Sequence, residues 1–115
     1  SQIAIATPGK MVYISGQVAW DKDGHLVGEG DLEMQTRKSI QNLKVAIESV
    51  GGTLDDILML RIYVVDLQSK PSEVISKALI ESFGTIPPAS TWLNVVGLAD
   101  PNFLIEIEAQ AIVPN

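Results

Sequence analysis

The chain has 115 residues, of which 46% are hydrophobic, and a formal net charge of −6. This length and apolar fraction predict one domain, residues 1–115, with a buried hydrophobic core. The eight basic residues are scattered, with only Arg37 and Lys38 adjacent, so the sequence lacks the basic stripe that a nucleic-acid surface requires.

Cysteine is absent and His25 is the only histidine, so a thiolate nucleophile and a cysteine- or histidine-based metal site are excluded. His25 follows the turn at Asp23-Gly24, where a solvated histidine is expected. No segment approaches the roughly 18–20 continuous apolar residues of a membrane span, and no cationic leader precedes an apolar stretch. We therefore expect a cytoplasmic protein without membrane or nucleic-acid partners.

The first half of the chain predicts strands followed by a long helix. Residues 11–15 form a β-rich apolar run, residues 3–6 have the composition of a strand before it, and residues 18–20 continue past a Ser-Gly-Gln corner. Asp31 is positioned to cap a helix that ends at Gly51-Gly52. Apolar or small residues recur in that helix at helical spacing: Thr36, Ile40, Leu43, Ile47 and Val50.

The second half alternates strands and a helix. Residues 57–66 are a nearly unbroken apolar run typical of a central strand. Residues 69–83 predict a helix with Pro71 in its first turn and Gly84 at its end. Residues 90–98 follow as a strand after two prolines. This order of elements predicts an α+β sandwich with both helices on one face of the sheet.

The last strand, residues 104–113, has the clearest pattern. Apolar and polar residues alternate with the period of a strand, so Glu106, Glu108 and Gln110 share the face opposite the apolar one. Two carboxylates on one strand face lie about 7 Å apart and need solvent or partners.

We expect apolar bulk on the sheet face away from the helices as well. The residues assigned to that face are Trp92, Val96, Leu104 and Ile112. A monomer would expose this patch, so its presence favours burial by self-association.

Four segments together resemble the Rid/YjgF family of reactive-intermediate deaminases: residues 9–17, the helix over residues 35–51, residues 88–91 and residues 105–109. The Ser-Gly-Gln corner and the Ile-Glu-Ile-Glu-Ala strand are the most specific matches. The resemblance implies a chorismate-mutase-like (YjgF-like) α+β sandwich with a mixed sheet, assembled as a homotrimer with clefts between subunits. It also implies hydrolysis of imines and enamines derived from amino acids to ammonia and a 2-keto acid, without metal or cofactor.

The resemblance also implies roles for individual residues. Glu106 corresponds to the family's catalytic glutamate, which orients or activates water. Ser15 and Gly16 would hold the nitrogen end of the substrate or the water. Deaminating members carry an arginine after the Pro-Ala pair to bind the substrate carboxylate, and this chain has Ser90 there. Trp92 replaces a residue that is often small or thiol-bearing, and the family's N-terminal tyrosine has no match.

Plain structural interpretations stand beside these roles. Glu106 and Glu108 could form the polar lining of a subunit interface. Ser15-Gly16 could be a tight strand corner that needs a small residue, and Trp92 could pack in an interface between subunits. Arg61 is expected to form a salt bridge. Its alternative role, binding the substrate in place of the missing arginine, stays open.

Three functions follow from these alternatives. The first is Rid-type hydrolysis of a small imine or enamine with specificity altered from 2-imino acids. The second is a noncatalytic trimer that binds a small metabolite in the same cleft. The third, ribonuclease activity, is disfavoured by the acidic charge and the lack of a basic groove.

Overall fold

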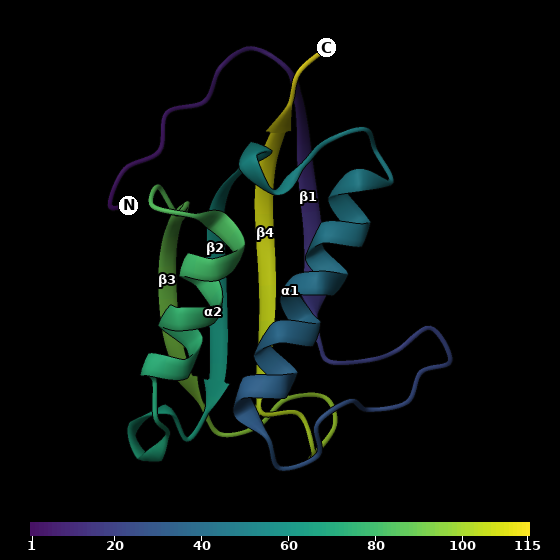
Figure 1. The fold of residues 1–115 in the computed structure, drawn as a ribbon, viewed down its shortest axis with the longest axis vertical. Helices are drawn as coiled ribbons and strands as arrows, with labels where there is room; N and C mark the ends of the chain where they lie inside the picture. The colour runs from purple at the N-terminus through teal and green to yellow at the C-terminus, as the bar shows by residue number, and fades with distance from the viewer.

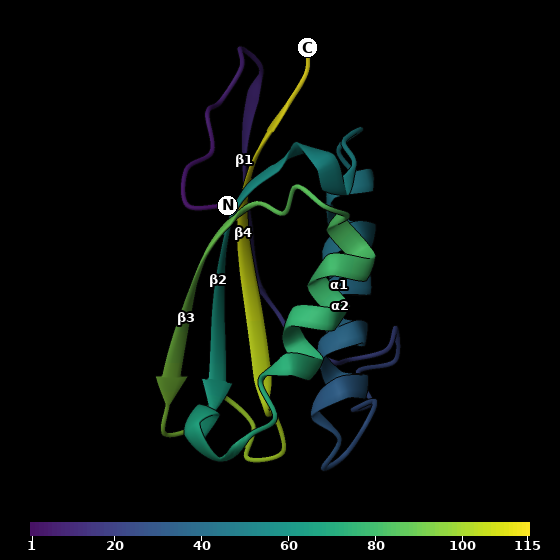
Figure 2. The ribbon, with the colours of Figure 1, turned by 60° about the vertical axis from the view of Figure 1, so that its left-hand side comes forward.

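A computed structural model, which describes residues 1–115, has a four-stranded sheet with both helices packed on one face (Figures 1 and 2). The sheet order is β1-β4-β2-β3, and only the β2–β3 pair is parallel, so the sheet is mixed. The strands are β1 (Lys10–Gln17), β2 (Ile57–Val65), β3 (Ala89–Val95) and β4 (Ile105–Val113). The helices are α1 (Leu32–Glu48) and α2 (Glu73–Phe83), with short 3₁₀ turns at η1 (Leu54–Asp56) and η2 (Leu67–Ser69). The expected α+β class is confirmed.

The long helix α1 forms as predicted as far as Glu48, whereas Val50, expected on its apolar face, lies beyond the end of the helix and is exposed. Asp31 is its N-cap, and its carboxylate accepts a hydrogen bond of 3.0 Å from the backbone N–H of Met34. After the helix, Gly51 adopts a φ of +86°, which a residue with a side chain rarely adopts. Ile40, Leu43 and Ile47 are buried against the sheet.

The second helix is shorter than the sequence indicated. The prediction began it at Ser69, whereas α2 begins at Glu73 and Ser69 belongs to the 3₁₀ turn η2. Lys70 is held in an extended conformation, because the ring of Pro71 clashes with a helical residue before it.

The core lies between the sheet and the two helices. Every second residue of β4 is buried, which confirms the predicted alternation. Leu60, Ile62 and Val64 of β2 lie beside them in register, and Ile75 of α2 packs on this layer. The buried residues of β4 are Ile105, Ile107, Ala109, Ala111 and Val113.

The N-terminal region differs from the prediction. Residues 3–6 form no strand, and Ile3 and Ile5 are exposed. β1 continues through the Ser-Gly-Gln corner to Gln17, with a register irregularity against β4 between Ile14 and Gln17. Residues 18–20 contribute only an isolated bridge between Trp20 and Leu26.

Two residues were assigned to the wrong sheet face. The parallel register pairs Ile62 with Trp92, so both side chains lie on the helix-facing side. Trp92 and Leu104 both pack against the core instead of lying on the open face. The prediction failed here because the register of β3 on β2 determines which of its residues face the helices.

The open sheet face is nevertheless partly apolar. Met11 and Tyr13 on β1 are 62% and 68% exposed, and Leu93 on β3 is 39% exposed. Together with Ile112 they surround the polar side chains of β4. No helix in the structure has the length and apolar character needed to cross a membrane.

Candidate functional site

The corner of β1 lies directly against the Glu106 side chain. A Cβ atom added to Gly16 would overlap the Glu106 carboxylate, with its Cδ at 2.5 Å and its Cγ at 2.7 Å. Gly16 has no positive φ, so the need for glycine comes from this close approach and not from backbone strain. The register irregularity between Ile14 and Gln17 occurs at the same point. Ser15, Gly16 and Glu106 are thus brought together.

The two carboxylates of β4 differ in their partners. Glu108 accepts a 2.5 Å hydrogen bond from the Tyr63 hydroxyl, and the guanidinium of Arg61 lies 3.7 Å from the same oxygen. Glu106 is opposite Tyr63 on β2 but forms no hydrogen bond or ion pair within the chain. Glu106 is therefore the carboxylate that is free to contact a ligand or a water molecule.

The pKa of Tyr63 is raised above its usual value of 10.0, first because its hydroxyl donates to Glu108 and then because of burial. The neutral phenol is favoured, which keeps this hydrogen bond in place at neutral pH. The role that the sequence analysis gave to Arg61, a salt-bridge partner, agrees with its contact to Glu108.

Ser15 also borders a shallow depression of about 270 Å³ on the open sheet face. Tyr13, Arg61 and Gln110 line it with Glu108. The guanidinium of Arg61 donates to Gln110 at 3.4 Å, so its polar contacts in the depression are long. This surface combines hydroxyl, amide and charged groups beside the free carboxylate of Glu106.

Ser90 and Trp92 occupy a different place. They line a pocket of about 200 Å³ between α2 and β3, on the helix-facing side of the sheet. The chain therefore brings Ser15, Gly16 and Glu106 together and brings Ser90 and Trp92 together, but it separates the two groups by the thickness of the sheet.

Sequence reasoning missed the helix wall of this pocket. Ser76, Leu79 and Ile80 of α2 line it with the β3 residues. Their spacing of three and four residues places them on one face of the helix, which was a usable signal.

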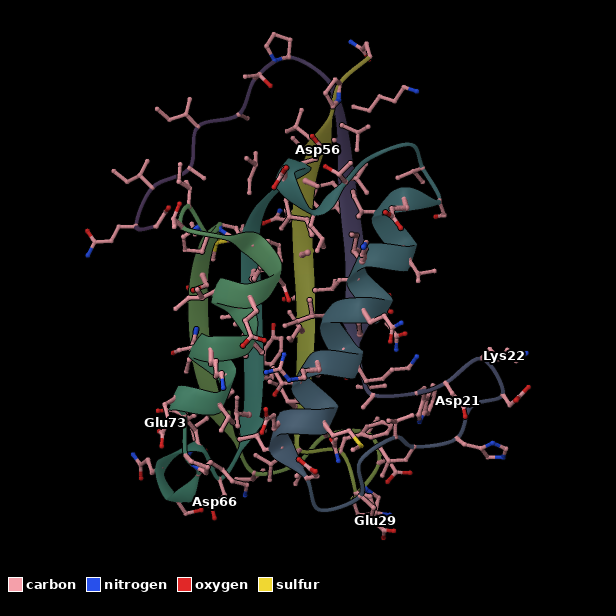
Figure 3. The ribbon with its side chains drawn as sticks, viewed as in Figure 1. Asp21, Lys22, Glu29, Asp56, Asp66 and Glu73 are labelled. Carbon is pink, nitrogen blue, oxygen red and sulfur yellow. The ribbon has the colours of Figure 1, made fainter.

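The loop between β1 and α1 carries a separate polar cluster (Figure 3). Ligand atoms of Asp21, Asp23 and His25 lie within 4.8 Å of one another. The Asp21 carboxylate accepts backbone N–H bonds from His25 and Asp23, and these bonds lower the pKa of Asp21, that from His25 most. The geometry is that of a turn stabilised by an aspartate, and His25 is exposed, as expected.

Comparison with known proteins agrees with this fold. Two helices on a mixed four-stranded sheet define a YjgF-like α+β domain, and a solved structure of YyfB from Yersinia pestis, a Rid-family protein of unknown function, superposes with a TM-score of 0.88. It is 36% identical over 98% of this chain and 86% of that one. A structure of RidA from the Antarctic bacterium Psychrobacter superposes with a TM-score of 0.82, at 25% identity over 97% of this chain and 86% of that one.

The sequence comparisons identify the family directly. The family model described as Endoribonuclease L-PSP matches residues 1–113. A RutC family protein from Pyrococcus abyssi is 33% identical over 105 residues, which are 90% of this chain and 79% of that protein. The chain belongs to the Rid/YjgF family, also described as the L-PSP family.

Proposed function

We propose that the protein hydrolyses a small imine or enamine at Glu106, without a cofactor, in a cleft between the subunits of a homotrimer. In this reaction water adds to the C=N carbon, the C–N bond breaks, and the products are a carbonyl compound and ammonia. The observation that carries the proposal is the Glu106 carboxylate, which has no partner in the chain and is held against the backbone of Gly16.

Glu106 is suited to act as a general acid–base group. A carboxylate without internal partners accepts a proton from an attacking water and returns it to the departing nitrogen, a role that contributes roughly 10²–10⁴-fold in rate. The missing side chain at Gly16 lets the Glu106 carboxylate approach the backbone of β1 at this point. Backbone groups of this corner and the Ser15 hydroxyl would hold the nitrogen end of the substrate.

Assembly would complete the site. Within one chain, Glu106 lies on the open sheet face, whereas Ser90 and Trp92 lie on the opposite face beside the edge strand β3. A ring of three copies, in which β3 of one subunit approaches the open face of the next, would bring the two groups to one ligand. The exposed Met11 and Tyr13 on that face support burial by a neighbouring copy.

The specificity is proposed to differ from that of enzymes acting on 2-imino acids. Ser90 stands where such members have the arginine that binds the carboxylate. A neutral hydroxyl contributes about 0.5–1.5 kcal/mol net to a hydrogen bond, compared with about 1.5–3 kcal/mol for a charged donor.

The missing arginine also motivates a second candidate function, a noncatalytic trimer that binds a small metabolite in the same cleft. This candidate expects stabilisation by ligand without product. The family description as an endoribonuclease adds a third, which the net charge of −6 opposes. Salt-sensitive binding of RNA would support it.

The test is ammonia release from imines by the wild-type protein and by Glu106→Gln, with Glu48→Gln on the exposed side of α1 as a matched control for the lost charge. We expect Glu106→Gln to lose turnover and Glu48→Gln to keep it, with the same oligomer mass by light scattering in all three. Full activity of Glu106→Gln would refute the proposed role.

A further inference from the structure

The corner of β1 at Ser15-Gly16 is a β-bulge in the pairing with β4. Ile14 of β1 pairs with Ala109 of β4. The next pair, Gln17 with Ile107, lies three residues further along β1 but only two residues back along β4, so β1 carries one extra residue at this point. Because the extra residue interrupts the ladder of hydrogen bonds, the geometry of the corner depends on contacts outside the sheet as well.

The side chain of Asn42 on α1 anchors the chain directly after the bulge. Its amide nitrogen donates to the carbonyl oxygen of Val18 at 2.8 Å and to that of Trp20 at 2.9 Å. Both N–H groups of the amide are therefore used, and a carboxylate, which only accepts, could not form these bonds. Residues 18–20 belong to no strand, so the two hydrogen bonds tie the exit of β1 to the helix.

A second amide on α1 holds the chain just before Glu106. Gln35 lies seven residues before Asn42, which is about two helical turns, so both side chains extend from the same side of the helix. The side-chain oxygen of Gln35 accepts from the backbone N–H of Leu104 at 2.9 Å, and its nitrogen donates to the carbonyl oxygen of Asn102 at 3.0 Å. The helix is thus bonded to both segments that meet at the candidate site.

We infer that Asn42 is a positioning residue for the proposed reaction, because its two hydrogen bonds fix the bulge of β1 against which the Glu106 carboxylate lies. Asn42 acts through the backbone of the corner and not on the ligand itself. Its effect on rate follows from geometry, since a displacement of about 1 Å at a reacting group costs roughly 10²-fold. The effect on rate rests on the proposed function, whereas the effect on the corner is measurable without turnover.

Two substitutions of Asn42 and one matched control test this role. Asn42→Asp removes both donors with almost no change of shape, and its carboxylate faces two carbonyl oxygens. Asn42→Ala removes the donors without adding charge, and it tests the same hydrogen bonds if the aspartate variant does not fold. Gln41→Glu adds the same charge at the neighbouring exposed position, where the side chain contacts Lys38 and not the corner.

The first measurement is NMR of the full chain, with two reporters at the corner and one remote reference. The reporters are the backbone amide of Gly16 and the side-chain carboxyl carbon of Glu106, and the reference is the amide of Gly84 at the end of α2. We expect both reporter resonances to move in Asn42→Asp and Asn42→Ala and to stay in place in Gln41→Glu, with the reference unchanged throughout. Unmoved reporters in the Asn42 variants would overturn the inference.

The second measurement is ammonia release from an imine by the same proteins. We expect Asn42→Asp to lower kcat/KM by roughly 10–100-fold at unchanged oligomer mass, and Gln41→Glu to keep the wild-type value. Combined with Gly16→Ala, Asn42→Asp should lower kcat/KM by less than its separate factor, because both changes displace the same contact. An asparagine that only stabilises the fold would lower the free energy of unfolding and leave kcat/KM unchanged, and that result would contradict a positioning role.

Two further outcomes separate this inference from the proposed function. If the corner reporters move in the Asn42 variants but the wild-type protein hydrolyses no imine, the control of the corner by Asn42 stands and the proposed catalysis fails. If the wild-type protein and Asn42→Asp hydrolyse an imine equally fast, the positioning role fails and the proposed catalysis stands.

Discussion

Replacement of Gly16 by alanine tests the contact on which the candidate site is built. The added Cβ would approach the Cδ of Glu106 to 2.5 Å and its Cγ to 2.7 Å, so the glutamate side chain must move. The atoms involved belong to the end of a flexible side chain, and a displaced rotamer costs roughly 0.5–1.5 kcal/mol. Replacing glycine by alanine at a compatible backbone conformation raises the free energy of unfolding by about 0.4–1 kcal/mol, because alanine lowers the conformational entropy of the unfolded chain.

The two terms nearly cancel, so the free energy of unfolding of Gly16→Ala should stay within about 1 kcal/mol of the wild type. Activity should respond differently. Because the carboxylate leaves its place at the corner, we expect imine hydrolysis to fall by up to the roughly 10²–10⁴-fold that general acid–base catalysis contributes.

The assays are urea unfolding and ammonia release from an imine. Gly97→Ala is the matched control, since a Cβ at Gly97 meets nothing within 4 Å and its φ is not positive. A Gly16→Ala protein that folds normally and keeps full activity would show that the position of the Glu106 carboxylate does not matter. A general acid–base role of Glu106 that depends on this position would then be refuted.

Three other predictions concern assembly, pH dependence and the core. Tyr13→Asp, on the exposed open face, should shift light-scattering mass toward the monomer, and an unchanged mass would argue against burial of this face. The raised pKa of Tyr63 contributes stability below pH 10 that is lost as the pH rises through the folded-state value. Glu108→Gln should therefore lower the midpoint of phenolate absorbance, and an unaltered titration would exclude the hydrogen bond as its cause. Ile62→Ala, at a fully buried position, should lower the free energy of unfolding by about 2–5 kcal/mol in urea titrations. A smaller loss would indicate that the core collapses around the cavity.

Local patterns made much of the fold predictable. The alternation along β4 and the Asp31 cap of α1 each depend on residues close in sequence, and both are confirmed. The sheet face on which Trp92 lies depends on the pairing of β3 with β2, whose partner residue Ile62 is about thirty residues earlier in the chain. Strand composition alone therefore predicted the wrong face. The expected strand at residues 3–6 has suitable composition but no pairing partner in the chain.

The site was only partly predictable for the same reason. Resemblance to the family identified Glu106, but the sequence treats Glu106 and Glu108 alike. Their difference arises on β2, where Tyr63 bonds to Glu108 and leaves Glu106 without a partner. The requirement for Gly16 also comes from a contact across strands, because the atoms that exclude a side chain belong to Glu106.

The most direct test of the proposed function is the lifetime of a neutral imine in the presence of the wild-type protein. The imine of benzylamine, generated by an amine oxidase, would be compared with the 2-imino acid of phenylalanine, each with a metal chelator present. We predict that the protein accelerates ammonia release from the neutral imine in proportion to the protein concentration, and more than from the 2-imino acid. Decay of both imines at their spontaneous rates would contradict it.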